Sequence, residues 1–142
     1  IKTCSKIKVP IAIIGGPTDT ANGKRIIDAL EHTNVYNLCG KLSLMESGFV
    51  LKKATLVLSN DTGLMHIASA FDKKIISFWG CTKPSLGMSP YTSEEGSLEI
   101  VSKTHQSPCS KLGNRCKSKN KNCIEDIAPE AILAAINRLL KT

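Results

Sequence analysis

Four residues in close succession, Asp61, Thr62, Gly63 and His66, are the chain's best candidates for binding an anionic ligand. A hydroxyl and the free backbone N–H groups at a helix N-terminus attract phosphate, and glycine lets a ligand come close to the backbone. First-turn amides, including that of Leu64, would cradle a phosphate or diphosphate. His66 follows Thr62 by four residues, so a helix would place both on one face. Because a carboxylate repels phosphate, we assign Asp61 to sugar hydroxyls.

The same residues have structural explanations. Asp61 could cap the helix, and His66 could be a hydrogen-bonded core histidine. Asp-Thr-Gly also surrounds the catalytic aspartate of aspartic proteases, which pair two such copies among β-hairpins. This chain has one copy before an expected helix, so a single-copy aspartic protease is a low-ranking alternative. The combination of these residues in one predicted cleft favours ligand binding.

Two further positions give weaker signals. Gly15 and Gly16 follow a short apolar run and could bring backbone close to a ligand, but they could equally end a strand. Glu46 could accept hydrogen bonds from a ribose. Its place as the fourth residue of Ser43-Leu44-Met45-Glu46 makes a structural capping box the stronger explanation.

Elements that would position these residues alternate along the chain. Short apolar runs predict strands at residues 9–14, 35–38, 55–59, 75–79 and 98–101. Helical spacing and caps predict helices over residues 18–33, 43–54, 64–71 and 129–140. This alternation predicts an α/β fold, a Rossmann-like parallel sheet with flanking helices. Ligands bind such sheets beyond the carboxyl ends of the strands, which selects the loops at residues 15–20, 60–63 and 80–84.

Composition limits the function classes. A chain of 142 residues fits one domain, and 42% hydrophobic with 22% charged residues exclude disorder and a fibrous protein. Apolar runs are too short for a transmembrane helix. The first residue is Ile1 rather than Met, and the opening lacks the apolar core of a signal peptide, so we interpret the chain as an excerpt from a longer protein. The net charge of +7 favours anionic partners. Only 4% of residues are aromatic, so we expect no nucleic-acid partner.

The six cysteines leave alternatives open. Cys4, Cys39 and Cys81 are scattered, whereas six residues separate Cys109 from Cys116 and Cys116 from Cys123, with His105 upstream. Structural zinc sites usually pair ligands two to four residues apart, a spacing that this run lacks, so no metal site is predicted. Without a secretory signal we expect reduced thiols. Three cysteines in one basic loop could equally form a disulfide or a small metal site.

Four segments then point to a family. They are Gly15-Gly16-Pro17-Thr18-Asp19 and the runs at residues 37–44, 54–70 and 78–84. Asp61-Thr62-Gly63-x-x-His66-x-Ala-x-Ala is their most specific part. In this order, over most of residues 9–91, the chain resembles glycosyltransferase family 9, the heptosyltransferases of lipopolysaccharide core assembly and their relatives.

The resemblance implies the C-terminal half of a two-domain GT-B fold. Residues 1–142 would form most of the donor-binding domain, without its first strand and without the N-terminal acceptor domain. The family transfers sugar from a nucleotide diphosphate donor, typically ADP-heptose, with inversion and generally without an essential metal, so no cofactor is expected. By position, Asp61 would touch the donor sugar, and Thr62, Gly63 and His66 the diphosphate. In the family, an acidic residue near the start of the second helix binds the ribose. The aligned position in this chain is Met45, and Glu46 is the next residue.

The resemblance also implies what the chain lacks. The family's general base, an N-terminal aspartate, and its interdomain phosphate-binding lysine have no match here, so we expect no catalytic residue in this chain and no turnover by it alone. Expected partners are the nucleotide-sugar donor and, through the missing domain, a glycolipid acceptor. The expected location is cytoplasmic, peripheral at the inner face of the membrane, where the basic loop from Lys111 to Lys121 could contact anionic lipid. The rival hypothesis is a non-catalytic nucleotide-binding module.

Overall fold

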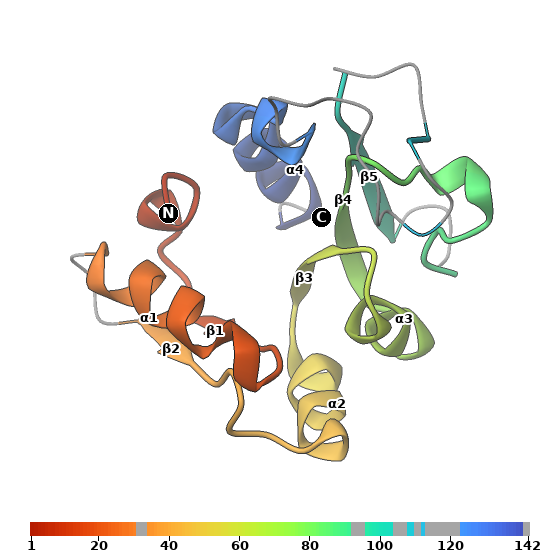
Figure 1. Cartoon of the computed structure of the whole chain (residues 1–142). Coiled ribbons are helices and arrows are strands. Elements are labelled where there is room, and N and C mark those ends of the chain that lie inside the picture. Colours follow the sequence, from red (N-terminus) through yellow and green to blue (C-terminus); the bar gives the residue numbers. More distant parts are fainter. Residues whose placement is uncertain (31–33, 92–95, 104–107, 110–111, 113–122, 141–142) are drawn as a thin grey trace. The chain divides into compact units, whose positions relative to one another are not determined.

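The computed structural model describes residues 1–30, 34–91, 96–103, 108–109, 112 and 123–140 (Figure 1). The chain divides into two compact units, Ile1–Phe49 and Val50–Thr142. None of the helices in the described ranges is long and apolar enough to cross a lipid bilayer.

The first unit is built around two short parallel strands. Its elements are η1 (Cys4–Lys6), β1 (Ile11–Ile13), η2 (Pro17–Asp19), α1 (Thr20–Asp28), β2 (Val35–Asn37) and the start of α2 (Leu44–Lys53). Ile11 pairs with Val35 and Ile13 with Asn37, so both expected strands are confirmed, although each is shorter than predicted. The helix expected from residue 18 begins as a 3-10 turn because Pro17 and Asp19 form a separate capped turn first.

Two positions in the first unit require glycine, one because of its backbone conformation and one because of a close approach. Gly40 has a φ of +69°, a left-handed conformation that side chains disfavour. Gly23 lies against the amide of Asn37, where an added Cβ would clash with Oδ1. That amide donates to the Thr20 carbonyl (3.0 Å) and accepts from Cys39 N (3.1 Å), so it cannot move without losing both bonds. These contacts join α1 to β2.

The second unit holds a three-stranded parallel sheet with the order β3-β4-β5. Its elements are β3 (Leu56–Asn60), α3 (Gly63–Ala70), β4 (Lys74–Trp79), η3 (Pro84–Leu86), β5 (Ser97–Val101), η4 (Cys123–Asp126) and α4 (Pro129–Leu140). In Figure 1, α3 and α4 lie on opposite sides of the central strand β4, and both contact β3 and β4. The strands and helices predicted in this part of the chain are confirmed to within a residue or two at each end.

The hydrogen-bonded ladders differ from the expectation in one respect. The sequence predicts one parallel sheet of five strands, whereas the described residues form separate ladders of two and three strands. All pairings in both ladders are parallel, as the alternation of strands and helices requires. Propensity and spacing identify strands but do not fix which strands share hydrogen bonds.

Strand β4 carries the core of the second unit. Ile75, Ile76, Ser77 and Trp79 are completely buried, as is typical of a central strand covered on both faces. Ser77 is the one polar member of this set, and its Oγ accepts a 2.8 Å hydrogen bond from Trp79 Nε1. The buried indole N–H is thereby satisfied inside the core.

Candidate functional site

The site is built where β3 ends and α3 begins. Thr62 is the N-cap of α3, and its Oγ1 accepts a hydrogen bond from Met65 N at 3.4 Å. Ser59 Oγ donates to the Asn60 carbonyl (2.8 Å) and lies 3.2 Å from Thr62 Oγ1. Because the single Ser59 proton is already used, Thr62 is the donor in that contact. The Thr62 hydroxyl therefore fixes both the strand end and the helix start.

The first turn of α3 has two backbone donors without an acceptor in the described part of the chain. The first N–H groups of any helix have no intrahelical partner. Among the described residues, none accepts a hydrogen bond from the N–H of Gly63 or Leu64. A Cβ added at Gly63 would meet nothing within 4 Å, so neither packing nor a positive φ requires glycine there. Two amide donors without an acceptor in the described ranges, next to a glycine whose Cβ position is open, form a suitable binding position for an anion.

Asp61 and His66 lie beside this position as a pair. Asp61 Oδ1 is 4.0 Å from His66 Nε2, longer than a hydrogen bond, and the His66 side chain is 50% exposed. The two structural explanations of these residues are therefore wrong. Thr62 caps the helix in place of Asp61, and His66 is not a core histidine.

Gly15 and Gly16 form a turn that is filled by the chain's own carboxylate. Gly16 N donates to Asp19 Oδ2 (2.9 Å), and Asp19 N donates back to the Gly16 carbonyl (3.0 Å). A Cβ on Gly15 would lie 2.7 Å from the same carboxylate oxygen. This closed turn favours the strand-ending explanation, while a ligand contact at Gly15 or Gly16 stays a prediction.

Glu46 forms the predicted capping box with Ser43. Its Oε2 accepts from Ser43 N and from Ser43 Oγ, both at 2.7 Å, and Ser43 Oγ accepts from Glu46 N at 3.3 Å. The bond from the Ser43 backbone N–H, followed by that from the Ser43 hydroxyl, lowers the pKa of the Glu46 carboxyl. The structural explanation of Glu46 is confirmed, and a ribose contact stays a prediction.

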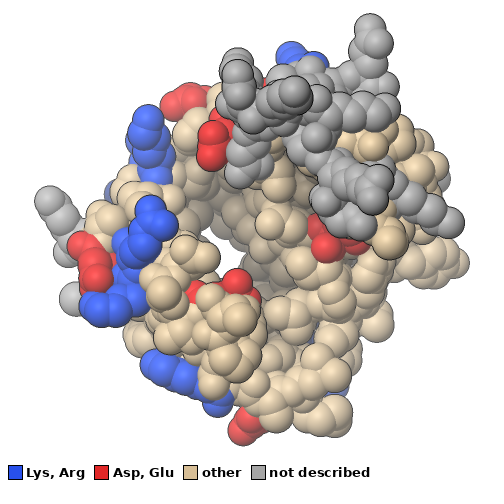
Figure 2. Space-filling model, viewed as in Figure 1, with Lys and Arg blue, Asp and Glu red and all other residues tan. Residues whose placement is uncertain are grey.

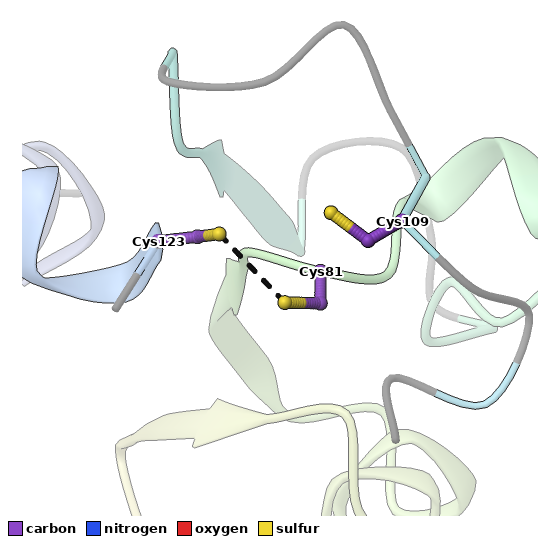
Figure 3. Close-up of side chains that lie close together, drawn as sticks. All are labelled: Cys81, Cys109 and Cys123. Carbon is purple, nitrogen blue, oxygen red and sulfur yellow. Dashed lines mark hydrogen bonds between the residues drawn. The ribbon is translucent and has the colours of Figure 1, made fainter. Parts of the chain in front are cut away.

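The loop after β4 contributes a feature that sequence reasoning missed. Cys81, Cys109 and Cys123 have sulfur atoms within 4.8 Å of one another (Figure 3). Cys81 is distant from Cys109 and Cys123 in the sequence, yet it follows the carboxyl end of β4, and Cys109 comes after the neighbouring strand β5. Adjacent parallel strands end at the same edge of a sheet, so the positions of Cys81 and Cys109 after two such strands could have indicated that the two residues lie close together. Cys116 and His105 lie outside the described residues.

The basic loop also lies outside the described residues, apart from Leu112. On the face that Figure 2 shows, Lys and Arg side chains of the described residues occur in several places, and Asp and Glu side chains lie on the same face. Membrane contact by residues 111–121 accordingly stays a prediction.

Comparisons with known proteins assign the chain to a family. Residues 2–121 match the model of glycosyltransferase family 9 (heptosyltransferase). The lipooligosaccharide heptosyltransferase 2 of Haemophilus influenzae is 32% identical over 135 residues, which cover 92% of this chain and 37% of that protein. The lipopolysaccharide heptosyltransferase 1 of Salmonella typhimurium is 36% identical over 81 residues, 57% of this chain and 24% of that protein. The matched part of this chain thus spans 37% of the first relative's length and 24% of the second's.

Solved structures share the fold. The structure of Escherichia coli ADP-heptose LPS heptosyltransferase II matches with a TM-score of 0.71 at 21% identity, over 93% of this chain and 37% of that one. A glycosyl transferase family 9 structure from Veillonella parvula matches with a TM-score of 0.77 at 21% identity. The match covers 98% of this chain and 39% of the Veillonella chain. The parallel strands and flanking helices are those of part of a GT-B heptosyltransferase structure. Since the family model covers most of its residues, the chain belongs to glycosyltransferase family 9.

Proposed function

We propose that residues 1–142 are the donor-binding domain of a heptosyltransferase and that the β3–α3 junction binds a nucleotide diphosphate sugar. One observation carries this proposal. The N–H groups of Gly63 and Leu64 have no acceptor among the described residues, a Cβ at Gly63 would meet nothing within 4 Å, and the half-exposed His66 lies next to the partly buried Asp61. A diphosphate needs converging donors, and its sugar needs hydrogen-bond acceptors. This junction offers both within one turn of helix.

Each residue has a separate role in the proposed site. The Gly63 and Leu64 amides donate to phosphate oxygens, supported by the positive end of the α3 dipole. The Thr62 hydroxyl holds the first turn in place through Ser59 and Met65. The half-exposed ring of His66 donates to a diphosphate oxygen. Asp61 accepts from sugar hydroxyls, because its carboxylate would repel the phosphates.

The relatives support a proposal for the donor and acceptor classes. One matched structure is described as an ADP-heptose LPS heptosyltransferase, and the curated relatives are heptosyltransferases of lipopolysaccharide or lipooligosaccharide. We extend that donor, ADP-heptose, and a lipopolysaccharide-core acceptor to the longer protein of which this chain is a part, acting at the cytoplasmic face of the membrane. Inverting transfer requires a base that deprotonates the acceptor hydroxyl, and we assign that base to a domain outside these residues.

We expect sugar transfer only when the rest of the protein is present. A protein that joins this chain to its upstream domain should transfer heptose from ADP-heptose to a core acceptor and invert the anomeric configuration. The 142-residue chain alone should bind the donor without turnover, because it lacks the base. Product formation followed by mass spectrometry, with the anomeric configuration read by NMR, measures both.

Two outcomes would contradict this account. Transfer by the isolated chain would mean that one of its own residues supplies the base. Donor binding without transfer by the longer protein would support the non-catalytic binding module instead.

A further inference from the structure

We propose that Cys81, Cys109 and Cys123 bind a zinc ion that fastens the C-terminal segment to the sheet of the second unit. The three thiols come from distant parts of the sequence and converge at one place (Figure 3). They lie at the end of β4, beyond β5 and at the start of η4. This cluster is separate from the residues assigned to the nucleotide sugar, and it is independent of the proposed transfer function.

The sulfur distances fit metal ligation better than a disulfide. Cys81 Sγ and Cys123 Sγ are 3.7 Å apart. A disulfide requires about 2.05 Å between its sulfur atoms. Tetrahedral zinc with Zn–S bonds of about 2.3 Å places its sulfur ligands about 3.8 Å apart. All three sulfur atoms already lie within 4.8 Å of one another, so small side-chain movements would complete a trigonal set of ligands.

The backbone holds the thiols together without a metal. Cys109 N donates a 2.8 Å hydrogen bond to the Cys81 carbonyl, which ties the two segments directly. Gly80 lets the segment of Cys123 approach β4, because a Cβ there would lie 3.1 Å from the Cys123 Cβ. Cys123 itself is only 2% exposed. This preorganisation lowers the conformational cost of metal binding.

The chemistry favours zinc over harder cations. Thiolates are soft ligands that select zinc over Mg²⁺ and Ca²⁺. On binding, each Cys Sγ gives its proton to solvent and forms a Zn–S bond, so Zn²⁺ with three thiolates carries one negative charge. The sequence between Cys109 and Cys123 contains five Lys and Arg residues and no Asp or Glu, which favours thiolates in this part of the chain. Water or one more donor completes the tetrahedron.

Zinc content measures the proposal directly. The full chain, purified under reducing conditions, should contain about one zinc ion per molecule by plasma mass spectrometry, as expected of a structural site. Cys81→Ser and Cys123→Ser each remove one ligand and should weaken zinc affinity at least about tenfold. Cys4→Ser is the matched control, because Cys4 lies outside the cluster, and it should keep the zinc.

A second measurement on the unmodified chain covers the case in which these variants fail to fold. Removing zinc with a chelator should lower the melting temperature reversibly, and Co²⁺ added in its place should give the intense absorption of thiolate-to-cobalt charge transfer. A metal-free chain without that absorption would overturn the proposal. An iron–sulfur chromophore or a Cys81–Cys123 disulfide found by mass spectrometry would also overturn it.

Discussion

Replacing Asp61 with alanine is expected to weaken binding of ADP-heptose by about 10- to 100-fold while leaving the affinity for ADP almost unchanged. A hydrogen bond to a charged group contributes about 1.5–3 kcal/mol, and each 1.4 kcal/mol is about tenfold in affinity. The proposed partner of Asp61 is the sugar, which ADP lacks. Isothermal titration of the variant with both ligands measures the two affinities.

His66→Ala serves as the comparison, because its proposed partner is the diphosphate. This variant should lose affinity for ADP and for ADP-heptose alike. Neither substitution should alter the melting temperature, since both side chains are partly exposed and neither caps α3. Equal losses for both ligands in Asp61→Ala would contradict the assignment of Asp61 to the sugar. Unfolding of both variants would restore a structural role for the pair.

Trp79→Ala is expected to lower the free energy of unfolding by about 3–5 kcal/mol, the usual cost of removing a large aromatic side chain from a core. Trp79 is completely buried on the central strand, and its loss leaves both a cavity and an unpaired Ser77 hydroxyl. Chemical denaturation followed by circular dichroism gives the value.

Two other aromatic substitutions separate the contributions. Trp79→Phe keeps much of the volume but removes the donor to Ser77, so it should cost about 1–3 kcal/mol for the unsatisfied group and the smaller ring. Tyr91→Ala removes an aromatic side chain that is 95% exposed and should stay within about 0.5 kcal/mol of the original chain. A loss in Tyr91→Ala as large as in Trp79→Ala would show that the core is not centred on β4.

Much of the fold could be predicted because its signals are local. The apolar run at residues 75–79 marks a strand buried on both faces, and Pro129 with the leucines and isoleucines after it marks α4. The capping box of Ser43 and Glu46 is encoded within four residues. The position of the β3–α3 junction follows from the strand and helix on either side of it.

Other features depended on geometry that the sequence does not carry. Asp61 and Thr62 are both good N-cap residues, and only the backbone conformation shows that Thr62 takes the cap. The approach of Cys123 to Cys81 and Cys109 depends on a tertiary contact, because the segment of Cys123 packs against Gly80. The environment of Cys39 is likewise not encoded locally: burial, followed by the charge of Asp19, raises the pKa of its thiol.

The most direct test of the donor site is the binding of ADP-heptose to the chain and to Gly63→Val. A Cβ at this position would meet nothing within 4 Å, so the variant should keep its melting temperature. It should also block the approach of phosphate to the Gly63 and Leu64 amides. We expect ADP-heptose to shift the NMR signals of these two amides in the original chain, and the variant to bind at least about tenfold more weakly, a loss of about 1.4 kcal/mol. Equal affinity in the variant, or shifts confined to other parts of the chain, would contradict the site.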